Sequence, residues 1–68
     1  MQIIDARGLS CPEPVILTRQ AMASGAASYQ VIVDNNTSKE NVTRYAHHQG
    51  YEVTISEQDG EYTLLISK

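Results

Sequence analysis

The chain has 68 residues, a formal net charge of −3 and one cysteine. Its size predicts one thin-cored globular domain, residues 1–68, either a whole protein or one domain of a longer one. Its scattered basic residues argue against direct nucleic-acid binding, and its net charge favours a protein partner with a basic surface. A lone cysteine forms no internal disulfide, and no apolar stretch is long enough for a bilayer, so we expect a cytoplasmic protein without membrane contact.

The first half of the chain predicts a strand, a helix and a second strand. Residues 2–6 are rich in Ile, and residues 7–10 form a loop that contains Gly8. Residues 12–23 have helical spacing of apolar side chains, and Gly25 is a suitable stop. The side chains on the core side of this helix are Val15, Leu17, Thr18, Ala21 and Met22. Residues 29–33, with β-branched and aromatic side chains, give the strongest strand signal.

The second half predicts a helix followed by a hairpin. Thr37 and Glu40 match a capping box, which places a helix from there to about Gln49. Its expected core side consists of Val42, Tyr45, Ala46 and Gln49. Apolar and polar residues then alternate over residues 51–56 and 62–66, around an Asp59-Gly60 turn. Since Phe and Trp are absent, we expect an aliphatic core.

The order β-α-β-α-β-β predicts an α+β fold, a two-layer α/β sandwich. Right-handed crossovers place both helices on one face of a four-stranded mixed sheet. The opposite face is then bare and carries Ile32 and Leu65. We expect this face to support a weak homodimer or to meet a partner.

Both prolines and the only cysteine fall in the segment Cys11-Pro12-Glu13-Pro14. Proline suits the first helical position, and the residue before it is extended, as an N-cap residue is. This predicts Cys11 at the N-cap, where the helix dipole favours the nucleophilic thiolate. With Pro14 at N3, only the amide of Glu13 is well placed to bond the sulfur. The carboxylate of Glu13 acts against the helix dipole, because a nearby negative charge raises the pKa of a thiol. Arg7 offsets this negative charge if the loop folds back.

Other uses of the thiol require partners that the sequence lacks. Disulfide exchange and peroxide sensing use a second cysteine. Zinc needs several ligands, and besides Cys11 the chain offers only His47 and His48, adjacent on a helix and 100° apart. We therefore expect no metal and no cofactor, and we assign the two histidines to the helix surface. A persulfide carrier needs one activated, exposed thiol, which this chain has.

Residues 5–14 resemble the D-x-x-G-L-x-C-P-x-P signature of the TusA/SirA/YedF-like sulfur carriers. Residues 34–35, 41–44, 49–53 and 59–60 resemble the YedF branch, so the similarity covers nearly the whole chain. The resemblance implies a two-layer β-α-β-α-β-β sandwich, similar to the C-terminal domain of a bacterial translation initiation factor. It also implies that Cys11 accepts sulfur as a persulfide from a cysteine desulfurase-type donor and passes it to an acceptor protein. The routes served by the family include tRNA thiolation, molybdenum-cofactor synthesis, sulfur oxidation and, for YedF-like members, selenium metabolism.

The family pattern carries over at Asp5, Gly8, Leu9, Cys11, Pro12 and Pro14. We expect Gly8 to permit a tight turn, Leu9 to pack under the helix start as a staple, and Asp5 to accept hydrogen bonds from loop amides. Ile16 lies on the outward side of the helix and is, with Arg7 and Arg19, a candidate docking residue.

The leading hypothesis is a sulfurtransferase-type carrier that uses Cys11. A non-catalytic interaction or redox-regulatory module remains an alternative, as does a domain that handles selenium with the same thiol.

Overall fold

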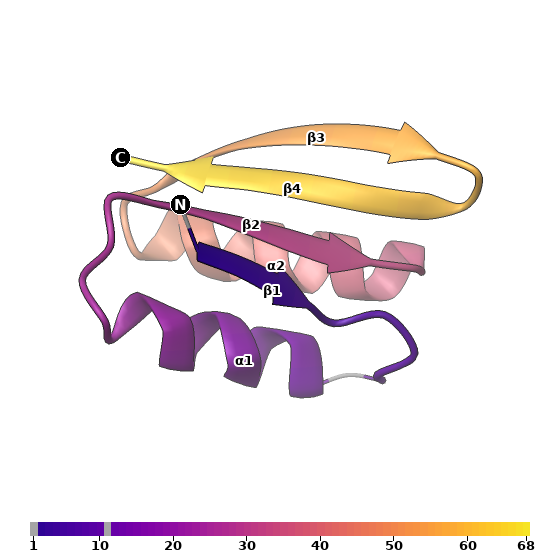
Figure 1. Cartoon of the computed structure of the whole chain (residues 1–68), viewed down its shortest axis with the longest axis horizontal. Helices are drawn as coiled ribbons and strands as arrows, with labels where there is room; N and C mark the ends of the chain where they lie inside the picture. Colours follow the sequence, from indigo (N-terminus) through magenta and orange to yellow (C-terminus); the bar gives the residue numbers. More distant parts are fainter. Residues whose placement is uncertain (1, 11) are drawn as a thin grey trace.

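Two helices cover one face of a four-stranded sheet (Figure 1). The structure is a computed structural model that describes residues 2–10 and 12–68. Its elements in chain order are β1 (Gln2–Asp5), α1 (Glu13–Met22), β2 (Ser28–Val33), α2 (Asn36–His48), β3 (Glu52–Gln58) and β4 (Glu61–Ser67). This architecture confirms the α+β sandwich predicted from the sequence.

The strands lie in the order β1-β2-β4-β3. β1 and β2 are parallel, while β4 is antiparallel to both β2 and β3. The hairpin strand β4 therefore occupies the centre, and β3 forms one edge. Asp59 (φ 53°) and Gly60 (φ 79°) both have positive φ between β3 and β4, which confirms the predicted turn.

The core lies between the sheet and the helices. Val31, Val33, Leu64 and Ile66 of β2 and β4 are fully buried. Tyr29 is also fully buried, so the expectation of a purely aliphatic core is wrong. Its hydroxyl donates to the Met22 carbonyl over 3.4 Å, and its ring meets that of Tyr51 edge-on with centroids 5.9 Å apart. Because its hydroxyl has a carbonyl partner, Tyr29 can be buried without leaving that polar group unsatisfied.

α2 begins earlier than its predicted capping box. Asn35 is the N-cap, and its side-chain oxygen accepts from the Ser38 amide over 2.8 Å. Thr37 is therefore inside the first turn, and Glu40 accepts instead from the Asn36 side chain. Val42 and Ala46 are buried as predicted, and Ser38 is buried with them. Gln49 is exposed, against expectation, because the helix ends at His48.

The sheet face opposite the helices carries the expected apolar side chains. Leu65 is 38% exposed and Ile32 is half-buried, and Ile3 beside them is 64% exposed. Ile55, one of the apolar residues in the alternating segment 51–56, is 43% exposed. It belongs to the edge strand β3, where burial is lower along the whole strand. Within the described residues, neither helix has the length and apolar character of a membrane span.

Candidate functional site: the loop between β1 and α1

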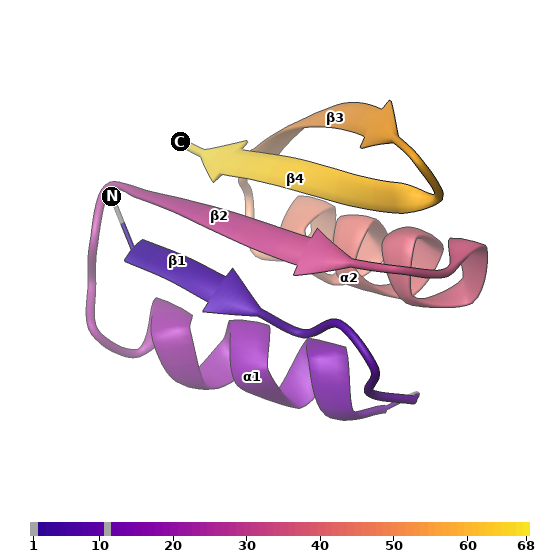
Figure 2. The ribbon, with the colours of Figure 1, turned by 45° about the vertical axis from the view of Figure 1, so that its right-hand side comes forward.

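The loop that contains Cys11 leaves the sheet where β1 and β2 end. Because these strands are parallel, their carboxyl ends lie side by side (Figure 2). Polar side chains at the two ends, Asp5 and Asp34, can therefore both reach the loop. Cys11 itself lies outside the described residues, so the geometry below is that of the loop residues on either side of it in the sequence.

Asp5 binds the beginning of the loop. Its Oδ1 accepts from the backbone amide of Arg7 over 3.1 Å and from Arg7 Nε over 2.9 Å, while Oδ2 accepts from a terminal guanidinium nitrogen over 2.8 Å. This matches the expectation that Asp5 bonds a loop amide. The hydrogen bonds from the Arg7 side chain and backbone lower the pKa of Asp5 to about 2.

Arg7 lies between two carboxylates. Its guanidinium contacts Glu61 of β4 over 3.4 Å as well as Asp5, and this environment, Asp5 first, raises the pKa of Arg7 above its ordinary value. The positive charge is thus already paired within the described residues. Arg7 is accordingly a weak choice for the cation expected to offset Glu13, while its side chain remains 44% exposed for a docking role.

Gly8 makes the turn in the middle of the loop. Its φ is +78°, as the expected tight turn requires, and its amide donates to Asp34 Oδ2 over 2.8 Å. A Cβ added at Gly8 would meet no atom within 4 Å, so the backbone conformation is what calls for glycine. Asp34 was not singled out as a site residue. The signal for it was its position directly after a strand that runs parallel to β1.

α1 begins one residue later than predicted. Pro12 is the N-cap, without a side-chain cap bond, and Pro14 lies in the first turn. The expectation that Pro12 occupies the first helical position is therefore wrong, while Cys11, expected at the N-cap, lies outside the described residues. The amide of Glu13 donates to the Ser10 carbonyl over 2.9 Å. This amide is consequently already bonded, which contradicts its predicted role as the donor to sulfur.

The first turns of α1 are packed on the side that faces the core. Pro14 and Thr18 are fully buried, and the Thr18 hydroxyl donates to the Pro14 carbonyl over 2.8 Å. Leu9 is half-buried and packs against the core. It lies three positions before the N-cap, too early for a hydrophobic staple, although it does contribute packing beneath the loop.

The other candidate docking residues lie on the outside of α1. Arg19 is exposed, as is Glu13, which was predicted as a motif residue and not for docking. Ile16 is half-buried and, among the described residues, is not one of the side chains that pack against the core, which agrees with its predicted place on the outward side. These positions leave one side of α1 open beside the loop.

A groove of about 370 Å³ runs between the two helices and reaches Pro12. Its other lining residues are Val15 of α1 and, from α2, Asn41, Arg44, Tyr45 and His48. The sequence reasoning missed this groove. Its signal was the helical spacing of residues 41, 44, 45 and 48, which places them on one side of α2. In residues 2–10 and 12–68, no cluster of three or more potential metal ligands occurs.

The fold and the sequence of this chain are both similar to those of known proteins, and these similarities indicate its class. A SirA-like protein from Desulfitobacterium hafniense superposes with a TM-score of 0.90 at 38% identity, covering 98% of this chain and 96% of that one. A Methanocaldococcus jannaschii protein with the name "Putative sulfur carrier protein" is 30% identical over 71 residues, covering 100% of this chain and 95% of the relative. The sulfur carrier protein TusA of Pseudomonas putida strain F1 is 30% identical over 69 residues, covering 97% of this chain and 86% of the relative.

The family follows from a model match over nearly the whole chain. Residues 2–68 match the family model described as sulfurtransferase TusA. The chain therefore belongs to the TusA family, as the signature in residues 5–14 predicted.

Proposed function

We propose that this protein is a cytoplasmic sulfur carrier that holds transferred sulfur as a persulfide on Cys11. The observation that supports it most is the fixed loop around this residue in a TusA-family chain. On one side Asp5 and Asp34 bind the loop, and on the other Pro12 caps a helix whose first turn is packed by Pro14. Peptide bonds keep Cys11 next to that helix start, where the positive end of the dipole favours a thiolate.

The proposed step is a transfer of one sulfur atom without net oxidation. The Cys11 thiolate attacks the terminal sulfur of a persulfide on a cysteine desulfurase-type donor. A new S–S bond forms on Cys11, the S–S bond of the donor breaks, and its electron pair stays on the donor thiolate. The same reaction in reverse roles delivers the sulfur to an acceptor protein. No oxidant, metal or cofactor of this chain is needed.

The acceptor route is the finer part of the proposal. We place this protein in tRNA thiolation or in related sulfur or selenium metabolism, as the resemblance to the YedF branch implies. The proposed displacement is the same for either element, because the Cys11 thiolate attacks the terminal sulfur or selenium of the donor, and the S–S or S–Se bond of the donor breaks to release the donor thiolate.

Intact mass spectrometry without reductant tests the proposal directly. The protein is incubated with an active cysteine desulfurase and cysteine, with Cys11→Ser as the matched variant. We expect the wild type to gain the mass of one sulfur atom, reversibly with reductant, and Cys11→Ser to gain none. Because the variant changes one atom in the side chain, its unfolding midpoint should match the wild type.

Two outcomes would contradict the carrier role. A gain of mass in Cys11→Ser would show sulfur at another position. No gain in the wild type, with donors that carry a persulfide or a selenopersulfide tested in parallel, would leave the alternative of an interaction or regulatory module.

A further inference from the structure

The outer side of α2 gathers the basic side chains of this acidic protein. Lys39, Arg44, His47 and His48, here called the α2 ridge, line one groove together. Apart from Lys39, Arg44 and Glu40, the chain has three Lys or Arg residues against seven Asp or Glu residues. The local charge of the ridge is thus opposite to that of the rest of the protein.

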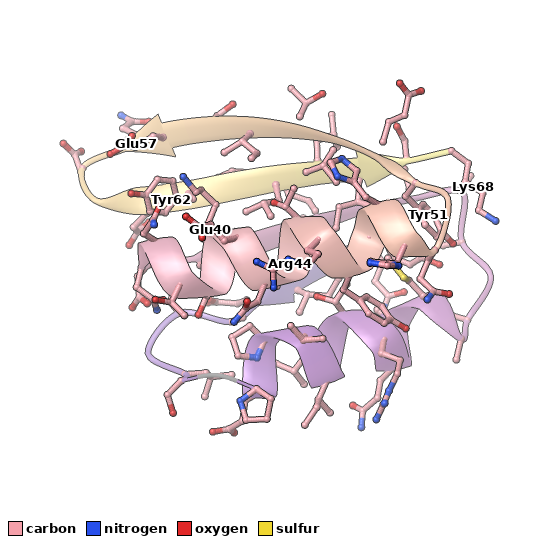
Figure 3. All side chains as sticks on the ribbon, turned by 180° about the vertical axis from the view of Figure 1, so that it is seen from behind. Glu40, Arg44, Tyr51, Glu57, Tyr62 and Lys68 are labelled. Atoms are coloured by element: carbon pink, nitrogen blue, oxygen red, sulfur yellow. The ribbon has the colours of Figure 1, made fainter. Side chains whose placement is uncertain are left out.

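The ridge separates two grooves. One, of about 390 Å³, lies between α2 and the edge strand β3 and includes Thr43 and the exposed side chain of Ile55. The other is the groove between the helices that reaches Pro12. Arg44 and His48 line both grooves, and Figure 3 shows Arg44 on the outward side of α2, between α1 and the β3–β4 pair.

The charges of the ridge are available to a partner. Both ion pairs among the described residues belong to Arg7. Arg44 contacts the neutral side chain of Asn41 over 3.4 Å, and the Lys39 ammonium lies 4.9 Å from the centre of the Tyr62 ring. Glu40, the acidic residue that lines the groove, accepts a hydrogen bond from Asn36 over 2.9 Å.

We propose that the α2 ridge binds a carboxylate-rich, partly apolar segment of a partner protein. Carboxylates meet Lys39 and Arg44, while apolar side chains fill the groove over Ile55. A short acidic segment fits better than a nucleic acid, because an extended phosphate backbone would run onto the acidic surface beyond the ridge. The net charge of the whole chain predicted a partner with a basic surface. For this face, the local positive charge predicts an acidic partner instead.

This inference concerns the surface alone and does not depend on sulfur being carried by Cys11. The two ideas nevertheless meet at one place, because the groove between the helices runs from Arg44 to Pro12, the neighbour of Cys11 in the sequence. A partner seated on the ridge is therefore beside the loop.

Amide NMR titration with defined probes tests the proposal. The probes are a peptide of Glu, Leu and Ala, the same peptide with Lys in place of every Glu, and oligo-uridine of similar length. We expect the acidic peptide to shift the amides of residues 39–48 and Ile55, and its affinity to fall as salt is raised. Arg44→Glu should weaken binding about fivefold or more, since it replaces attraction by repulsion at an exposed site. Lys68→Glu, with the same charge change away from both grooves, should bind as the wild type does.

The result that would overturn the proposal is equally specific. Equal affinity for Arg44→Glu and wild type, or shifts confined to the bare face around Ile3 and Leu65, would remove the ridge as the site. Tighter binding of oligo-uridine than of the acidic peptide would assign the ridge to nucleic acid instead. Arg44 is exposed, so its variant should keep the wild-type amide spectrum outside α2, and Arg44→Gln provides an intermediate case.

Discussion

The two helices of this protein begin in opposite ways. At α2, the side chain of Asn35 accepts a first-turn amide, so residues within the first turn satisfy the helix end locally. At α1, Pro12 provides no side-chain cap. The loop before α1 is instead held by residues at the ends of two strands. Asp5, at the end of β1, and Asp34, directly after β2, accept hydrogen bonds from backbone amides of this loop.

The difference separates stability from function. A locally capped helix start uses its polar side chains for its own amides, as α2 does. A start whose loop is fixed from the sheet leaves the residue before the helix free of that task. At α1 the residue before the helix is Pro12, which has no polar side chain, and the loop is bonded by Asp5 and Asp34 instead. If Cys11 carries sulfur, as proposed above, its side chain is not needed as the cap of α1.

The largest effect on the loop is expected from Gly8→Ala, because alanine at φ +78° costs about 1–2 kcal/mol in the folded state. Gly50→Ala is a matched control, since Gly50 has φ +86° and equally open space around a Cβ but follows α2. Urea unfolding should show similar losses for both variants. Only Gly8→Ala should also slow sulfur uptake in the mass-spectrometric assay.

Equal uptake rates for the two glycine variants would contradict the idea that the loop conformation matters for the thiol. If both variants slowed uptake to the same degree, general loss of stability would explain the effect instead.

A smaller effect is expected at the other helix start. Asn35→Ala removes the cap of α2 and should lower the free energy of unfolding by about 1 kcal/mol. Asn36→Ala, one residue on, removes only a side-chain contact to Glu40 and should cost about 0.2–0.5 kcal/mol. Urea unfolding measures both, and sulfur uptake should be unchanged in each. Slower uptake in Asn35→Ala alone would mean that the two helix starts are coupled.

The order of the elements was predictable because periodicity and turn residues are local signals. Alternation in residues 62–66 and the Asp59-Gly60 turn placed the hairpin, and the out-of-phase Ile32 and Leu65 identified the bare face. The cap of α2 was ambiguous for a physical reason. Residues 34–38 are Asp, Asn, Asn, Thr and Ser, all of which can cap a helix, so the choice among them depends on where the strand before them ends.

The features that the sequence did not predict depend on contacts between distant segments. Gly8 and Asp34 are 26 residues apart, and no local pattern links the amide of one to the carboxylate of the other. Pro12 satisfies the rules for a helix start at either of two adjacent positions, so the sequence left a one-residue uncertainty there. The groove beside the α2 ridge was hidden in the same way, since Ile55 joins its lining only once β3 is placed beside α2.

The smallest expected effect is the acid sensitivity of the loop through Asp5. Since the folded protein lowers the pKa of Asp5 from its ordinary 3.8 to about 2, the Asp5–Arg7 contact stabilises fully above about pH 4. The stabilisation is lost as the pH falls through 2, because the carboxylate is then protonated in the folded state as well. Asp5→Asn should be less stable than the wild type at pH 7, with the two urea midpoints converging between pH 4 and pH 2. High salt should shrink the gap at pH 7, because both side chains are about half exposed. A gap that stays constant down to pH 2 would show that the Asp5 carboxylate contributes through packing and not through its charge.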